Sequence, residues 1–160
     1  MGNFTSALRT NTAFWLAALI LLAAGCAAPP YRMDIPDAFK QYDTNQSLKW
    51  ISADGVMLNT REVKNDPQAP ATFWQDALVH HMTAQGYAHS ATDCFTTQQG
   101  QHACTSTFLL PKGNQDWVLS ETLFVGDKKI VLVEVTGEYA RYEALADDIS
   151  AALRTFAPNR

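Results

Sequence analysis

The chain has 160 residues, with 12 basic and 16 acidic side chains and a formal net charge of −4. This length suits one domain with its own core. The acidic balance argues against nucleic-acid binding, which needs a basic face, and against adhesion to anionic lipid through charge. The glycines form no phosphate-cradling run, and we expect no cofactor.

The first 25 residues have the pattern of a secretory signal peptide. Arg9 is their only charge, and it precedes an apolar run of roughly 12 residues, which is short of the ~20 that a membrane-spanning helix needs. The run ends in LAAGC at residues 22–26. This resembles the lipobox of bacterial lipoproteins, with the leucine one place further out than in the commonest form. The resemblance implies cleavage before Cys26 and acylation of its thiol, which anchors a protein without spanning the membrane.

The residues after the cysteine indicate where the protein is delivered. Alanine, rather than aspartate, occupies the second mature position. By resemblance to enterobacterial lipoproteins, this implies the outer membrane, with the protein facing the periplasm. Pro29-Pro30 stiffens the exit from the bilayer. We therefore expect a signal peptide over 1–25, a lipidated tether over 26–46 in which residues 35–39 dock on the domain, and a single domain over 47–157.

The three cysteines predict a lipid anchor and one disulfide. Cys26 is consumed by the lipid, which leaves Cys94 and Cys104 for each other in an oxidising compartment. The two are equidistant from Gln99 in CFTTQQGQHAC. A three-residue hairpin loop with Gly100 in the left-handed conformation places them directly opposite each other. We therefore expect a disulfide across this hairpin.

An earlier hairpin is indicated by Asp54-Gly55, which lies between two β-rich runs. A two-residue turn at this dipeptide pairs Ile51 with Leu58. Both faces of the resulting strands carry apolar residues. The sheet is therefore expected to be covered, at least in part, on both sides.

Two further segments have helical patterns. Pro70 suits a first helical turn, Thr72 and Gln75 fit a capping box, and Gly86 suits the end of that helix. In residues 138–156, apolar side chains recur at intervals of three and four, which predicts a helix with one buried face. Between the helices, the sequence predicts strands beside the cysteine hairpin and near 106–110, 117–125 and 130–136.

The resulting order, β-β-α-β-β-β-β-α, predicts the α+β class: a single, mainly antiparallel sheet with two main helices packed on it. This order, DGV at 54–56 and FW.DAL...M...GY at 73–87 resemble small envelope lipoproteins of uncharacterised function. More distantly, they resemble the PsbP-like fold of an extrinsic photosystem subunit. The resemblance covers about residues 47–156. Its motifs are mostly core and turn residues, so it implies a fold and carries no functional residues.

The histidines are weak candidates for metal ligands. Asp76 and His80 share a helix face, and His89 follows the helix. The adjacent His80 and His81 point about 100° apart, and no His-Glu-x-x-His motif is present. The alternative, which we favour, is one histidine at the edge of the core and the others in solvent, with no metal site.

No catalytic residue is assigned from the sequence. The serines lack the Gly-x-Ser-x-Gly elbow, and oxidised cysteines provide no thiolate. Glu134 lies in an apolar strand, where burial would raise its pKa; pairing with a basic residue or a place at the sheet margin is the alternative. Trp117 follows a predicted loop over 113–116, and an exposed aromatic there would suit a ligand or partner.

The sequence favours a non-catalytic, lipid-anchored module that binds a protein or another envelope component. One alternative is a periplasmic hydrolase whose site is assembled from scattered polar residues. A deep pocket that holds Glu134 or His80 would favour it. The other alternative is metal or small-ligand binding through His80 and His89.

Overall fold

The computed structural model describes residues 31–43 and 49–158. Cys26, the signal peptide and the first part of the expected tether lie outside these residues. The elements in chain order are β1 (Tyr31–Arg32), β2 (Phe39–Asp43), β3 (Lys49–Ser52), β4 (Met57–Lys64), α1 (Ala71–Ala84), β5 (Ala88–Thr96), β6 (His102–Lys112), β7 (Gln115–Val125), β8 (Lys129–Glu138), α2 (Tyr139–Glu143), α3 (Ala146–Arg154) and β9 (Ala157–Pro158).

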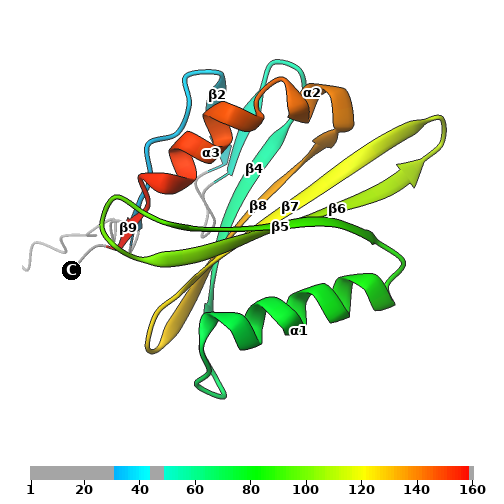
Figure 1. The fold of residues 1–160 in the computed structure, drawn as a ribbon. Helices are drawn as coiled ribbons and strands as arrows, with labels where there is room; N and C mark the ends of the chain where they lie inside the picture. Colours follow the sequence, from blue (N-terminus) through cyan, green and yellow to red (C-terminus); the bar gives the residue numbers. More distant parts are fainter. Residues whose placement is uncertain (1–30, 44–48, 159–160) are drawn as a thin grey trace, which may run out of the picture.

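Seven strands form one antiparallel sheet in the order β2-β3-β4-β8-β7-β6-β5, and β1 pairs with β9 in a separate ribbon. Helix α1 lies on one face of the sheet, and α2 and α3 lie on the other (Figure 1). The expected α+β class is therefore confirmed. No helix among the described residues is long and apolar enough to cross a bilayer.

Residues 31–43 belong to the fold, although they were expected within the tether. Phe39 in β2 is buried, as expected for a docking segment, but β2 also pairs with β3 as an edge strand. Tyr31 in β1 donates a hydrogen bond to Thr60 and stacks on Phe156 with ring centroids 5.5 Å apart. The domain boundary near residue 47 is thus too late. β1 has only two residues, and the two aromatic residues of the five-residue β2, Phe39 and Tyr42, are three apart, so no period-two pattern marks the strands.

The main core fills the space between the sheet and α3. The rings of Phe124 and Phe156 stack with centroids 3.8 Å apart, and Phe95 meets Phe124 edge-on at 6.3 Å. Ile149 and Leu153 of α3 are buried against this group, as the helical spacing predicts. Aromatic stacking adds to the stabilisation that burial provides.

The predicted C-terminal helix is two helices. α2 ends before Ala144, and Leu145 has φ −113° and ψ 0°, which breaks the helical path before α3. The Leu145 amide donates to the Tyr142 carbonyl at 2.9 Å in a tight turn. Both of these side chains pack against the core, so the apolar spacing continues across a change in direction.

The cysteine hairpin has the register predicted from its loop. Cys94 lies opposite Cys104, Phe95 opposite Ala103, and Gly100 has φ +82°. The disulfide is present, with the two Cα atoms 4.1 Å apart. It joins the edge strand β5 to β6.

The β3–β4 hairpin differs from its prediction by one residue. Trp50 pairs with Leu58 and Ile51 with Met57, so the expected pairing of Ile51 with Leu58 is wrong. The loop has three residues because the amide of Ser52 bonds the carbonyl of Val56 at 2.9 Å, while the Ser52 hydroxyl accepts the Val56 amide at 3.1 Å. A one-residue change of register exchanges the two faces of a strand.

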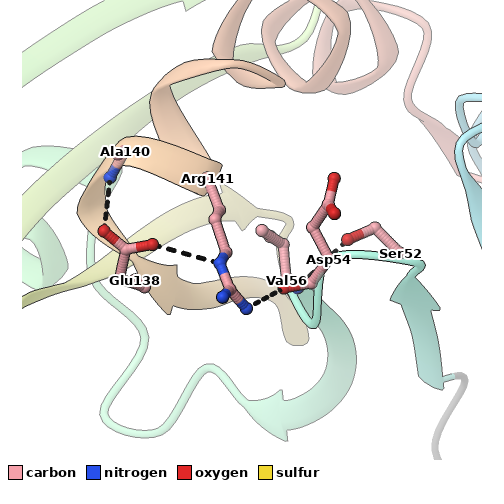
Figure 2. Close-up of polar contacts among 6 residues, drawn as sticks. All are labelled: Ser52, Asp54, Val56, Glu138, Ala140 and Arg141. Atoms are coloured by element: carbon pink, nitrogen blue, oxygen red, sulfur yellow. Dashed lines mark hydrogen bonds and ion pairs between the residues drawn. The ribbon is translucent and has the colours of Figure 1, made fainter.

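Helix α2 contacts this loop through the side chain of Arg141 (Figure 2). Arg141 donates from Nη1 to the carbonyl of Asp54 at 2.7 Å, and its Nε lies 3.1 Å from the Glu138 carboxylate. Glu138 also accepts the Ala140 amide and so caps α2. These contacts place the DGV motif against the end of β8. There, a Cβ on Gly137 would lie 3.0 Å from a methyl of Val56.

Substituting Gly137 with alanine is expected to destabilise the protein by about 1–3 kcal/mol, because the added methyl overpacks a site where Val56 is fully buried. Urea unfolding measures the loss. A double variant that also carries Val56→Ala should lose less stability than the sum of the two single losses, because it lacks the Val56 methyl that the added Cβ would contact. Strict additivity of the two losses would contradict this explanation.

Candidate binding groove beside helix α1

Helix α1 covers only part of its face of the sheet. It packs against β5, β6 and β7, its side chains reach one end of β8, and β4 and the rest of β8 extend beyond its flank. Trp74 and Leu78 of the helix rest on a small apolar cluster of the sheet. That cluster consists of Leu123, Ile130 and Leu132. A groove therefore runs between the helix and the uncovered strands.

Two pockets lie on this face of the sheet, the larger beside α1 and the smaller next to Tyr87, shortly after the helix ends. The larger has a volume of about 350 Å³, and its walls include Trp74, Leu78, Leu123 and Leu132, with Glu121, Arg61, Lys64 and His81 also in the lining. The smaller has a volume of about 270 Å³, and its walls include Tyr87, Leu110, Trp117 and Leu119, with Glu134 and Lys112. Each is near the lower limit of pockets that bind small molecules.

A line of polar side chains crosses the sheet between the two pockets. The strand registers place one polar residue from each of five neighbouring strands side by side. We call this line the polar row. Its members, from β4 to β5, are Asn59, Glu134, Glu121, Ser106 and Thr92.

Hydrogen bonds join most of the polar row and link it to α1. Gln75 donates from its amide to the Ser106 hydroxyl, which also lies 3.2 Å from the Thr92 hydroxyl. At the other end, the Asn59 amide donates to Glu134 at 3.4 Å. The helix is thus positioned over the row by a polar contact as well as by apolar packing.

Three oxygen atoms at the row accept no hydrogen bond from the described residues. They are Oδ1 of Asn59, Oε1 of Gln75 and Oε2 of Glu121, and all three are buried. Glu121 is 3% exposed and Gln75 is 7% exposed. Each unmatched buried polar atom lowers the free energy of unfolding by about 1–3 kcal/mol, so the three together destabilise the folded protein. All three are acceptors, and the row can therefore receive donors.

Burial raises the pKa of Glu121, and the neighbouring charge of Glu134 raises it further, while Arg61 partly offsets both effects. A carboxyl group whose pKa is higher in the folded than in the unfolded state keeps its proton longer in the folded state. The free energy of unfolding therefore falls as pH rises from the unfolded pKa of ~4.3 through the folded value, and stays lower above it.

The variant Glu121→Gln is expected to lack this decline. Its stability should follow that of the wild type below about pH 4 and exceed it above the titration of Glu121, because the amide is never charged. Urea unfolding at a series of pH values measures the difference. Asp76→Asn, which makes the same chemical change at an exposed position on α1, is the control. Equal stability of Glu121→Gln and wild type at every pH would contradict the explanation.

Trp117 and Glu134 both line the smaller pocket. Trp117 lies within β7, in agreement with the predicted strand over 117–125, although the strand begins earlier, at Gln115. Its ring is half-buried rather than exposed, with the Lys112 ammonium 4.8 Å from the ring centre. Glu134 is half-buried and bonds Asn59 rather than a basic side chain.

Glu121 and Gln75 are the groove residues that the sequence did not reveal. Gln75 was expected in a capping box with Thr72, but Pro70 occupies the N-cap position of α1 without a side-chain cap. Gln75 is instead buried over the polar row. The available signal for Glu121 was a charged residue between Leu119 and Leu123 on one face of the predicted strand over 117–125.

The expected metal candidates do not converge. Asp76 and His80 are exposed on α1, and His89 bonds the Thr92 hydroxyl at 2.9 Å. Within residues 31–43 and 49–158, the one group of three ligand-type side chains close enough for a metal is at the cysteine hairpin. It consists of Cys94, His102 and Cys104, and its two cysteines form the disulfide.

Comparison with known proteins supports the fold. No family model matches the chain, and no curated protein sequence matches it. LpqN of Mycobacterium tuberculosis, involved in cell envelope biogenesis, is 12% identical with a TM-score of 0.64, over 86% of this chain and 88% of that one.

Two further structures are similar. CyanoP, the cyanobacterial PsbP of Synechocystis, is 11% identical with a TM-score of 0.52, over 86% of this chain and 98% of its own. PA94 of Pseudomonas aeruginosa, a protein of unknown function, is 10% identical with a TM-score of 0.54, over 76% and 98%. The chain therefore has a PsbP-like α+β fold, as its motifs suggested.

Proposed function

We propose that this chain is a lipid-anchored protein of the bacterial outer membrane whose domain binds an envelope component in the groove beside α1. The observation that carries the proposal is the polar row, where buried acceptors without donors lie between two largely apolar pockets. Apolar walls with a few convergent polar groups are typical of binding sites.

The anchor is proposed from the lipobox at residues 22–26. Each buried methylene of an acyl chain contributes about 0.8 kcal/mol, so two or three chains on Cys26 would hold the protein firmly. A place in the envelope also agrees with the role of LpqN, which shares the fold.

A hydrolase is a second candidate, supported by one observation. Glu121 and Glu134 are direct cross-strand neighbours, and burial raises the pKa of Glu121. Paired carboxyl groups are typical of acid–base catalysis. Binding is preferred because the pockets on either side of the row are largely apolar, as is typical of binding sites.

A photo-crosslinking amino acid at Ala77 tests the binding function in intact cells. Ala77 lines the larger pocket, and Ala151 is an exposed alanine on α3, on the opposite face, which serves as the matched control. A defined product is expected from position 77 and not from 151, and Glu121→Gln should reduce it. Equal labelling at both positions, or none, would refute the proposal.

A further inference from the structure

We infer that the groove binds a small amphiphile whose polar end is an ammonium group held at the polar row and whose apolar body lies in the larger pocket. This inference rests on the proposed function and specifies the ligand class of the same site. It is carried by the hydrogen-bonding capacity and the burial of the row.

Glu121 defines the polar end. Its Oε2 is buried, accepts no hydrogen bond from the described residues and belongs to the lining of the larger pocket, whereas Asn59 and Gln75 line neither pocket. An ammonium group has three donors and no acceptor, so it adds no unmatched atom of its own. A hydroxyl has one donor, and a sulfate or phosphate ester presents further acceptors.

The charges inside the groove favour a cation. Glu121 and Glu134 are direct neighbours across β7 and β8, so a positive group between them would offset their repulsion. Three basic side chains, Arg61, Lys64 and His81, also line the larger pocket, but all three are exposed. Solvent screens their charges more than it screens that of Glu121, which is 3% exposed.

The larger pocket accounts for the apolar body. Trp74 and Leu78 on the helix face Leu123 and Leu132 on the sheet, and Glu121 belongs to the same lining. A chain of a few methylenes in this volume of about 350 Å³ places its end group next to the carboxylate. Each methylene removed from water strengthens binding.

Three probes with the same eight-carbon chain test the polar end. Octylammonium, octanol and octyl sulfate are titrated into the full mature chain carrying Cys26→Ser, below their micelle concentrations, and binding is followed by amide NMR shifts. We expect octylammonium to shift residues of the groove and to bind about tenfold or more tightly than octanol, since hydrogen bonds to charged groups are the stronger ones. Octyl sulfate should bind most weakly.

Variants locate the ammonium. Glu121→Gln and Glu134→Gln should each weaken octylammonium binding by about tenfold or more and change octanol binding little. Asp76→Asn, which removes an exposed carboxylate from helix α1, should leave the affinity for octylammonium unchanged. NMR spectra of each variant show whether the fold is retained, so a loss of binding is separable from unfolding.

The outcomes separate this inference from the proposed function. Equal binding of the three probes in the groove, or preference for octyl sulfate, would overturn the ammonium inference and leave a binding groove. Shifts confined to surface residues outside the groove would also overturn it. If no probe binds and position 77 yields no crosslink, both proposals fail.

Discussion

Replacing Cys26 with serine is expected to remove the protein from the outer membrane. Serine provides no thiol for acylation, so the chain either enters the soluble periplasmic fraction or stays in the inner membrane with its signal peptide. The wild type should band with the outer membrane. One acyl chain binds a membrane only reversibly, whereas two or more, as expected on Cys26, bind firmly. Sucrose-gradient fractionation and palmitate labelling measure the two distributions.

A variant without the other two cysteines provides the control. Cys94→Ala/Cys104→Ala keeps Cys26 and should fractionate and incorporate palmitate like the wild type. Should the Cys26 variant also remain in the outer membrane with label, the lipoprotein interpretation would be wrong.

Removing the Cys94–Cys104 disulfide is expected to lower the free energy of unfolding by about 2–3 kcal/mol. The bridge closes a loop with a sequence separation of 10 and so restricts the unfolded chain. It also ties β5, an edge strand, to β6, its one neighbour in the sheet among the described residues. Urea unfolding of the oxidised wild type, the reduced wild type and Cys94→Ala/Cys104→Ala measures the effect.

The reduced protein and the double alanine variant should lose similar amounts of stability, because both lack the bridge that restricts the unfolded chain. Mass spectrometry of the protein isolated from the periplasm without reductant should find neither thiol free. Free thiols there, or an unchanged unfolding midpoint after reduction, would contradict the stabilising role.

Local patterns predicted local structure well. The register of the cysteine hairpin follows from a loop of three residues, because Gly100 is the residue that tolerates the left-handed conformation at its end. The β3–β4 register did not follow from Asp54-Gly55. There, the Ser52 hydroxyl accepts the Val56 amide and closes a wider loop, which a dipeptide signal does not contain.

The groove was not predictable in the same way. Asn59 and Glu134 are 75 residues apart, and they meet because β4 pairs with β8 in one register. Glu121 joins them through a second pairing. Trp117 and Glu134 were selected as single unusual residues, yet no local pattern gives the side-by-side arrangement of the polar row. It depends on the topology of the whole sheet.

The central position of β8 in the sheet dictates the order in which a growing chain can fold. β4 precedes α1 in the sequence, but its central partner β8 follows three further strands. On the ribosome, β5 to β8 can pair with their sequence neighbours as they emerge, whereas β4 has only β3 beside it until β8 is synthesised. Leu58 and Thr60, which end fully buried, therefore stay exposed along an open strand edge for most of synthesis. The N-terminal strands of the nascent chain thus depend on the last strand of the sheet.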